Sequence, residues 1–427
     1  MLKKIVKHFL LIALLFTTSS IAQAATLMPN TTATMQNPEF WARKPELRST
    51  VLDEVQIKIF NQKLIDTKKI YALDKYPTRV SRADLVKQIQ ALQIPDDSLY
   101  VNGKLMSPPL KELLLDARNL SSIPAIVTPR YGVVVRRANM RTMPTSTAAY
   151  DSVTDKNFDM FQETVLDPAE PVIVLHESKN KGFLFVQMYN YRGWVASTDI
   201  ALVKERVQWL KYVQSKDFIM VTAAKLKIQV GSEVVVAQMG SKLPLSTHQT
   251  NADFTVVMPT RGLQGELIEQ NALVRNDSKV QYGYLPYTRE NVIMQAFEML
   301  GEPYGWGGMF DSVDCSSFIS NIYRTMGINL PRNADEQEAV AATVEKFNGN
   351  KVDALQVFAQ LKPGTAVFKE GHVMLYIGSY KGVPYLIHSL SSYADARIMQ
   401  VVVSDTNLRM RSGPLLIETL RTAVDYR

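Results

Sequence analysis

The sequence predicts a multi-domain protein in which a helical N-terminal region and two small β-barrels precede a C-terminal α+β domain. The chain has 427 residues, which is too many for one hydrophobic core. Apolar residues recur at helical spacing from Thr50 to about Asn119, and from Ile126 short strands divided by turns replace that pattern. After Pro286, helical segments are followed by a strand hairpin, which indicates a mixed fold.

Residues 1–24 have the pattern of a secretory signal. Three lysines precede an apolar stretch, and Ala22-Gln23-Ala24 forms a small-residue cleavage pattern. The apolar run is short for a membrane span and no second candidate follows, so we predict an exported protein, periplasmic or secreted, without a transmembrane segment in the mature chain. Removing the three lysines lowers the formal net charge from +7 to +4 (7 − 3), because the segment carries no acid.

Composition excludes several classes of protein. The mild positive charge gives only weak attraction to anionic polymers, and no basic patch interleaved with aromatic residues supports nucleic-acid binding. With one cysteine, the chain has no internal disulfide, so its cores must supply its stability. We expect a monomer that needs no cofactor.

The region 25–125 is predicted to be a helical domain without catalytic residues. Apolar residues at 51, 55, 59 and 60 have helical spacing. Ser81-Arg82-Ala83-Asp84 is typical of a capping box that opens a helix through Leu92, and Pro109 begins another through Leu120. We interpret this region as a structural cap or brace.

Two sets of short strands follow. The first set lies between Val133 and Val195, and the segments 141–145 and 191–195 resemble bacterial SH3 signatures. A second set between Phe218 and Ile268 suggests another SH3-like barrel with weaker signatures. The barrels are either rigid spacers or binding modules whose exposed aromatics stack on sugar or peptide; the candidates are Tyr150, Tyr189 and Tyr191.

The only cysteine, Cys315, is predicted to begin a helix. The Gly/aromatic loop 304–308 is followed by Asp314-Cys315-Ser316-Ser317 and an apolar-periodic run that Gly327 closes, with Asp314 or a neighbour as the N-cap. Backbone N–H groups and the helix dipole favour a thiolate there, so we expect a pKa below that of a free thiol. The polar neighbours favour a nucleophile over an apolar core residue.

Two histidines flank a predicted hairpin downstream. His372 precedes an apolar strand, His388 ends another, and turn residues 378–382 separate the strands. A direct pairing would bring the two Cβ atoms to about 5 Å, whereas a shift by one residue would turn the rings to opposite faces. We assign His372 as the base and His388 as the group that orients it. A zinc site built from Cys315 and both histidines is the weaker alternative, because no other metal-ligand spacing accompanies them.

These motifs together resemble the NlpC/P60 cell-wall cysteine peptidases. Tyr-Gly-Trp-Gly-Gly, Asp-Cys-Ser-Ser, Leu-Pro-Arg, Gly-His-Val-x-Leu-Tyr-Ile-Gly and Ile-His occur in that order within residues 286–427. The resemblance implies a papain-like α+β fold and cleavage of the bond between γ-D-glutamate and a diamino acid in peptidoglycan stem peptides. It implies Cys315 as nucleophile, His372 as base and His388 as third member.

The resemblance also implies substrate-binding positions: Tyr304, Asp314, Ser316 and the position of Asn333. Members that recognise a free N-terminal L-alanine typically have Asp-Ser after Leu-Pro-Arg, where this chain has Asn333-Ala334. An amide lacks the charge-assisted bond to an ammonium group, so a strict preference for a free amine is not implied. Asp335 is a candidate substitute.

The function expected from sequence is an exported cysteine endopeptidase acting on peptidoglycan or muropeptides. Two alternatives stay open besides zinc hydrolysis: a wall-binding SH3 protein with an idle peptidase domain, and a thiol amidase or acyltransferase with another substrate. The predicted boundaries are signal 1–24, helical domain 25–125, first barrel 126–204, second barrel 205–285 and catalytic domain 286–427.

Overall fold

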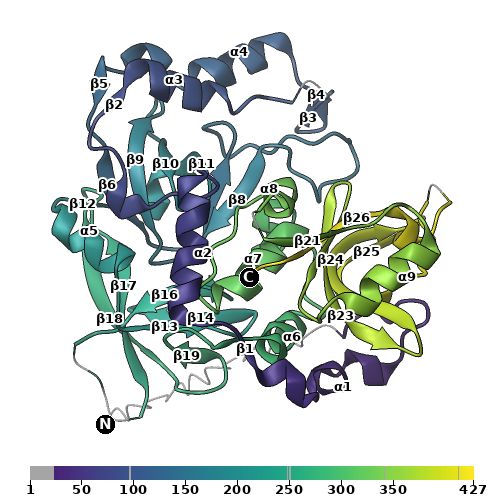
Figure 1. Ribbon diagram of the computed structural model, residues 1–427. Helices are drawn as coiled ribbons and strands as arrows, with labels where there is room; N and C mark the ends of the chain where they lie inside the picture. The colour runs from purple at the N-terminus through teal and green to yellow at the C-terminus, as the bar shows by residue number, and fades with distance from the viewer. Residues whose placement is uncertain (1–23, 96–97, 248, 250–251, 341, 412) are drawn as a thin grey trace, which may run out of the picture.

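The computed structural model describes residues 24–427, apart from 96–97, 248, 250–251, 341 and 412. The predicted signal therefore lies outside the described residues, except for Ala24. Figure 1 shows the C-terminal sheet and its helices beside the β-rich middle of the chain, while the N-terminal segment, in purple and blue, extends along both. No helix among the described residues combines the length and apolar character needed to cross a membrane.

The C-terminal domain is built on a six-stranded antiparallel sheet in the order β21-β26-β22-β23-β24-β25. Helices α6 and α7 share a core with one face of this sheet, and α9 shares a core with the other. The elements are α6 (Arg289–Glu298), α7 (Cys315–Arg324), α8 (Ala334–Glu338), β21 (Thr343–Lys346), α9 (Lys351–Gln360), β22 (Ala366–Lys369), β23 (His372–Tyr380), β24 (Val383–Tyr393), β25 (Ala396–Asp405) and β26 (Leu420–Asp425).

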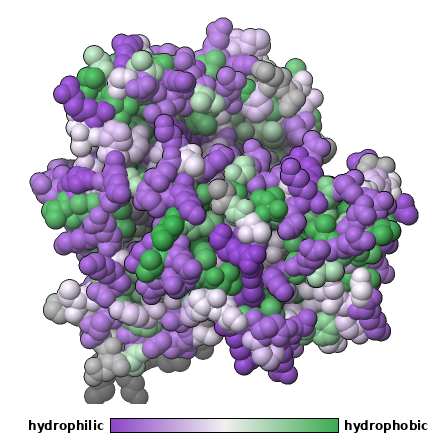
Figure 2. Space-filling view, viewed as in Figure 1, coloured by the Kyte–Doolittle hydropathy of each residue, from purple (hydrophilic) through white to green (hydrophobic). Residues whose placement is uncertain are grey.

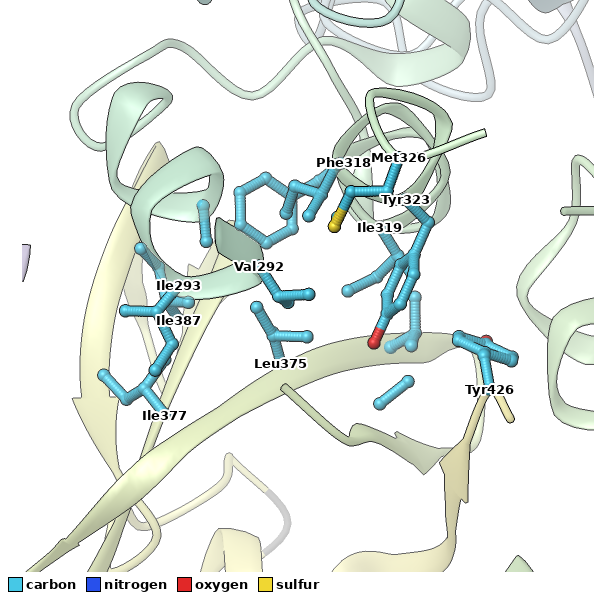
Figure 3. Close-up of a cluster of buried hydrophobic side chains, with 14 of the residues drawn as sticks. Val292, Ile293, Phe318, Ile319, Tyr323, Met326, Leu375, Ile377, Ile387 and Tyr426 are labelled. Atoms are coloured by element: carbon cyan, nitrogen blue, oxygen red, sulfur yellow. The ribbon is translucent and has the colours of Figure 1, made fainter. Parts of the chain in front are cut away.

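The core between the sheet and the two helices follows from strand alternation. Leu375 and Ile377 of β23 meet Val292 of α6 and Phe318 of α7, as Figure 3 shows. Tyr376, which lies between them in the sequence, instead packs with Phe358 of α9, with the two ring centroids 5.2 Å apart. Successive strand residues therefore serve two different cores, which fixes the sheet between the helices.

Helix α7 begins and ends where the sequence predicts. Asp314 is the N-cap, and its Oδ1 accepts a hydrogen bond of 2.9 Å from the backbone N–H of Ser317. The predicted stop is confirmed at Gly327, whose φ of 83° belongs to the left-handed region that favours glycine. Cys315 is therefore the first residue of the helix.

The hairpin differs from the prediction in a way that matters for the histidines. Its turn is only Lys381-Gly382, both with positive φ, and the strands are longer than expected. Near the turn Gly378 pairs with Tyr385, a register that would place His388 opposite Leu375 and turn its ring away from His372.

A β-bulge corrects this register. Ile377 is an extra residue in β23, so that Tyr376 pairs with Leu386 and Leu375 with Ile387. The next position outward places His388 opposite Met374, on the same face as His372 and diagonal to it. The two histidines are therefore nearly opposite each other, in a diagonal and not a direct pairing.

The first barrel consists of a seven-stranded sheet in the order β12-β6-β9-β10-β11-β7-β8. All four strands predicted for it are present, and Phe185 and Trp194 are fully buried in its core. The strands are β6 (Arg130–Val134), β7 (Ala138–Arg141), β8 (Gln162–Leu166), β9 (Pro171–Glu177), β10 (Phe183–Gln187), β11 (Arg192–Ala196) and β12 (Ile200–Val203).

The segment 205–285 forms three small sheets. Their orders are β16-β13-β19, β14-β15 and β17-β18. Ile219 and Met258 of this segment share one hydrophobic core with Ile173 and Trp194 of the first barrel. The second barrel stays a prediction. The elements are α5 (Arg206–Val213), β13 (Phe218–Val221), β14 (Lys225–Val230), β15 (Glu233–Gln238), β16 (Lys242–Pro244), β17 (Phe254–Arg261), β18 (Leu267–Val274) and β19 (Val280–Tyr282).

The N-terminal helices do not pack on one another as a separate domain. Trp41 and Phe60 belong to the core of the C-terminal domain, Leu85 belongs to the core of the barrels, and Leu114 packs near Phe161. The interpretation as a brace fits this distribution. The elements are α1 (Pro38–Ala42), β1 (Thr50–Leu52), α2 (Glu54–Asp66), β2 (Val80–Ser81), α3 (Arg82–Gln90), β3 (Tyr100–Val101), β4 (Lys104–Leu105), α4 (Pro108–Asp116), β5 (Ile126–Val127) and β20 (Tyr287–Thr288).

Short 3-10 helices connect these elements. They are η1 (Ala33–Gln36), η2 (Pro45–Arg48), η3 (Leu73–Lys75), η4 (Leu120–Ser122), η5 (Ser197–Asp199), η6 (Trp306–Asp311) and η7 (Leu416–Thr419). On the face seen in Figure 2, hydrophilic residues predominate and hydrophobic residues lie in separate groups among them.

Replacing Trp41 by alanine tests the bracing role of the N-terminal segment. The indole is 4% exposed and lies 5.2 Å, centroid to centroid, from the ring of Tyr385 in the sheet. We expect Trp41→Ala to lower the free energy of unfolding by about 3–5 kcal/mol, measured by denaturant titration. The control is Val55→Ala in α2, where the side chain is 63% exposed and the change should stay within about 0.5 kcal/mol. Equal, small effects would contradict the bracing role.

Candidate active site

Cys315 lies at the start of α7, beside the start of β23. Its sulfur accepts hydrogen bonds from the backbone N–H groups of Val373 and Ser316. Val373 directly follows His372, so the fold brings the thiol to the residue next to the predicted base. Burial, together with the nearby Asp314 carboxylate, raises the pKa of the thiol to about 11. The expectation of a lowered pKa is wrong, because burial and a like charge outweigh the helix terminus.

The two histidine rings are in direct contact. His372 Nε2 lies 2.7 Å from His388 Nδ1, and His388 Nε2 lies 3.0 Å from the hydroxyl oxygen of Ser404. Burial lowers the pKa of His372 well below its usual value and that of His388 to about 3, so both rings are neutral at neutral pH. Ser404 in β25 is a residue that sequence reasoning missed, since it belongs to no motif.

One choice of tautomers for the two neutral rings satisfies both hydrogen bonds and leaves His372 able to act as a base. When His388 donates its Nε2–H to Ser404, its Nδ1 is an acceptor, and His372 must donate its Nε2–H to it. The Nδ1 atom of His372 then carries a lone pair. This tautomer leaves His372 able to accept the proton of a thiol.

Asp314 and Ser316 belong to a buried network and not to an open pocket. Arg332 Nη2 donates to Asp314 Oδ2 at 2.6 Å, and Arg332 Nη1 donates to the Ser316 hydroxyl at 2.8 Å. All three residues are at most 7% exposed. Arg332 also donates to Thr164 Oγ1 of the first barrel at 2.7 Å. The network therefore ties the N-terminus of α7 to strand β8.

The Gly/aromatic loop packs against the same strand. At Gly307 and Gly308, both with positive φ, an added Cβ would lie 2.8 Å from Gln162 and 2.4 Å from Val165. Gln162 also donates to the carbonyl oxygen of Gly307 at 2.9 Å. These glycines are needed because the barrel approaches the loop backbone too closely for a side chain.

Tyr304 stands at the beginning of this loop. Its phenol is buried, and burial together with the Asp314 and Cys315 charges raises its pKa. The phenol therefore stays protonated and able to donate a hydrogen bond near the sulfur. The ring of Phe158, from the first barrel, lies 6.0 Å from that of Tyr304.

Asn333 is the N-cap of α8 and contacts the first barrel. Its side chain forms a hydrogen bond with the hydroxyl of Tyr191. Tyr191 in turn donates to Glu163 Oε2 at 2.5 Å, and Thr142 donates to Glu163 Oε1 at 2.5 Å. Glu163 is a second residue that sequence reasoning missed, because the barrel supplies it from far along the chain. Asp335, the candidate substitute, is exposed on α8.

The predicted residues thus divide into two groups. Cys315, His372, His388 and Tyr304 gather at the junction of α7 and β23, while Asp314, Ser316 and Asn333 connect that junction to the barrel. Among the described residues, no group of three or more His, Cys, Asp or Glu side chains is placed to hold a metal ion.

The fold and site define the class of protein: an α+β domain with a helix-borne cysteine against a sheet that carries two histidines is a cysteine peptidase domain. Comparison with known proteins agrees. Residues 301–404 match the model of the NlpC/P60 family, and residues 148–196 match that of the SH3 domain of SH3b1 type. The chain therefore carries an NlpC/P60 family domain, a family of cysteine peptidases, at residues 301–404 and an SH3b-type domain at residues 148–196.

Relatives with an assigned activity match parts of the chain. Dipeptidyl-peptidase 6 of Lysinibacillus sphaericus is 26% identical over 217 residues, which cover 49% of this chain and 74% of that protein. The γ-D-glutamyl-L-lysine dipeptidyl-peptidase of Bacillus subtilis (strain 168) is 32% identical over 117 residues, 27% of this chain and 37% of that protein.

Solved structures share the fold. An NlpC/P60 endopeptidase from Photobacterium damselae subsp. piscicida has a TM-score of 0.77 at 18% identity, and the match covers 94% of this chain and 99% of that one. An NlpC/P60 family protein from Bacillus cereus ATCC 10987 has a TM-score of 0.51 at 19% identity, covering 69% and 99% of the two chains.

Arg332 tests how strongly the buried network holds the site. In Arg332→Met the Asp314 carboxylate remains buried without its partner, so we expect a loss of about 3–5 kcal/mol in the free energy of unfolding. Arg421→Met is the matched control, because the Arg421–Glu338 pair is half exposed and should be worth about 1 kcal/mol or less. Denaturant titration measures the free energy of unfolding of both variants. Equal losses would show that the buried network contributes no more to stability than an exposed ion pair.

Proposed function

We propose that this protein hydrolyses peptidoglycan stem peptides, at the γ-D-glutamyl-diamino acid bond, by attack of Cys315. The observation that carries the proposal is the hydrogen-bonded chain from His372 through His388 to Ser404, next to the sulfur at the start of α7. The γ-D-glutamyl specificity printed in the name of the Bacillus subtilis relative supports the choice of bond.

The reaction begins with a neutral Cys315 thiol and a neutral His372 imidazole. Since the pKa of the thiol is raised and that of His372 lowered, the proton moves from Sγ to His372 Nδ1 as the sulfur attacks the amide carbonyl. His388 orients the His372 ring by accepting a hydrogen bond from its Nε2–H. The Cys315 backbone N–H, in the first turn of α7, lies where it can stabilise the oxyanion.

The second half restores the enzyme. When the C–N bond breaks, His372 gives its proton to the leaving amine, and a thioester between Cys315 and the glutamyl group remains. Water attacks the thioester, His372 accepts a proton from that water, and the thiol is released with that proton. No cofactor takes part in these steps.

Replacing Cys315 tests the reaction directly. We expect Cys315→Ala and His372→Ala to lower the rate of muropeptide cleavage by about 10³-fold or more, because neither variant can form the thioester efficiently. Mass spectrometry of digested muropeptides measures the products. His176→Ala is the control, since that imidazole, on strand β9, bonds to the backbone carbonyl oxygens of Arg118 and Asn119 and not to residues of the site.

The same assay separates the alternatives. Unchanged products with Cys315→Ala would sink the thiol mechanism. Binding of sacculi by the wild-type protein without any product would favour an idle peptidase domain, and activity lost to a chelator but insensitive to iodoacetamide would favour the zinc hydrolase.

We further propose that Glu163 receives the free amino group of a stem peptide. Its carboxylate is half-buried, is held by Thr142 and Tyr191, and forms no ion pair within the described part of the chain. Asn333, where an aspartate was expected, lies next to Tyr191. The negative charge that the amide at 333 lacks would then come from the barrel.

A pair of peptides tests the role of Glu163. We expect kcat/KM for a stem peptide with a free N-terminal L-Ala to exceed that for its N-acetylated form by about tenfold to a hundredfold, because a charge-assisted hydrogen bond is worth about 1.5–3 kcal/mol. In Glu163→Gln this preference should disappear. Glu177→Gln, which alters an exposed ion pair with Arg130 on the same barrel, should keep it. A preference that survives in Glu163→Gln would exclude this assignment.

Export to the periplasm or beyond completes the proposal, as do the predicted boundaries at 126, 205 and 286. The lysines and cleavage pattern of the N-terminal segment support export. A monomer fits the way one chain supplies both the nucleophile helix and the barrel beside it.

A further inference from the structure

A cavity of 260 Å³ lies between the two halves of the β-rich region and the far end of α7, away from Cys315. Its wall is formed by the end of α2 with the segment after it, the start of β9, the segment after β10, the end of α5, β13 and β16, and the end of α7. Its lining includes the charged residues Asp74, Glu170, Lys242 and Arg324 and the phenols of Tyr71, Tyr189, Tyr212 and Tyr284.

Three of the charged residues have partners within the protein. Glu170 and Arg324 form an ion pair, and the Arg324 guanidinium lies 5.0 Å from the centre of the Tyr189 ring. Asp74 Oδ2 accepts a hydrogen bond of 3.1 Å from Gln214. Glu170 and Arg324 therefore offset each other, whereas Asp74 keeps its negative charge beside a neutral amide.

Lys242, the fourth charged residue of the lining, has no oppositely charged partner among the described residues. Its Nζ lies 4.3 Å from the centre of the Phe218 ring, and within the described part of the chain it forms no ion pair with a carboxylate. Burial, and after it the positive charge of Arg324, lowers the pKa of the amine to about 8.

An ammonium group held against an aromatic ring without a counter-ion is costly, and a bound anion would recover that cost. The phenols around the cavity offer rings for stacking and hydroxyl groups for donation, which suits a ligand with a polar ring or a short peptide backbone. The lining therefore favours a small carboxylate over an uncharged sugar.

We propose that this cavity is a second binding site, which takes a carboxylate-bearing sugar or peptide through an ion pair with Lys242. It is separate from the catalytic site, because Arg324 lies at the opposite end of α7 from Cys315. The choice of a wall fragment as probe rests on the proposed function, whereas the need for a carboxylate rests on the cavity alone.

The probe is N-acetylmuramic acid, and N-acetylglucosamine is the matched sugar without a carboxylate. Methyl NMR of the methionines locates binding, since Met188 and Met220 line the cavity and Met374 lies in the core against α9. We expect saturable shifts at Met188 and Met220 with N-acetylmuramic acid and with N-acetyl-D-alanine, but not with N-acetylglucosamine. Shifts with inorganic phosphate alone would overturn the carboxylate assignment.

The proposal predicts how ligand affinity changes with pH, and two substitutions at Lys242 test that prediction. The ammonium form predominates below pH 8, so affinity should be constant there and should fall about tenfold per pH unit well above it. Lys242→Met should lower the affinity at pH 7 at least tenfold, and Lys242→Arg should remove the fall above pH 8, because a guanidinium stays charged.

Equal affinity in Lys242→Met, or a wild-type affinity that does not change between pH 7 and pH 9.5, would overturn the proposal. Cys315→Ala should bind the probe as the wild type does. The two proposals are thus tested separately: muropeptide products report on the peptidase activity, and the methyl shifts of Met188 and Met220 report on binding in the cavity.

Discussion

The buried ion pair between Asp314 and Arg332 is the interaction on which the rest of the site depends. It lies between two folding units, because Asp314 caps α7 and Arg332 also bonds to Thr164 of the first barrel. A buried charge pair is stable only when further hydrogen bonds satisfy it. Ser317, Gly307 and Ser316 supply those bonds. The position of the nucleophile is thus coupled to the position of the barrel.

This coupling gives the first barrel more than a tethering role. Strand β8 contacts the Gly/aromatic loop through Gln162 and the ion-paired arginine through Thr164, and the neighbouring Glu163 points its carboxylate to the side where Tyr191 and Asn333 meet. Of three consecutive residues in this strand, Gln162 therefore binds the loop, Glu163 provides the acidic group, and Thr164 binds the arginine that pairs with the helix cap. The barrel is therefore part of the structure that holds the start of α7 in place.

Burial also decides the electrostatics of the reacting groups. A helix N-terminus by itself favours a thiolate. Here the sulfur is partly buried next to a carboxylate, while the imidazoles, also largely out of water, have no carboxylate beside them, so the neutral forms of both are preferred. In the proposed mechanism, charge separation is then confined to the reaction itself, when the proton passes to His372.

Sequence patterns determined a large part of this protein. The N-cap at Asp314, the stop at Gly327, the strands of the first barrel and the hairpin that carries His372 and His388 all follow from local rules of capping, alternation and turn chemistry. Tertiary structure alone decided the rest. The bulge at Ile377, which brings His388 to the same face as His372, depends on the packing of β23 between two cores. Glu163 and Ser404 join the site across long stretches of chain, and the pKa of Cys315 depends on burial. Local sequence carries no signal for contacts between distant segments or for exclusion of water, and these are the physical terms that set register, charge and the shape of the site.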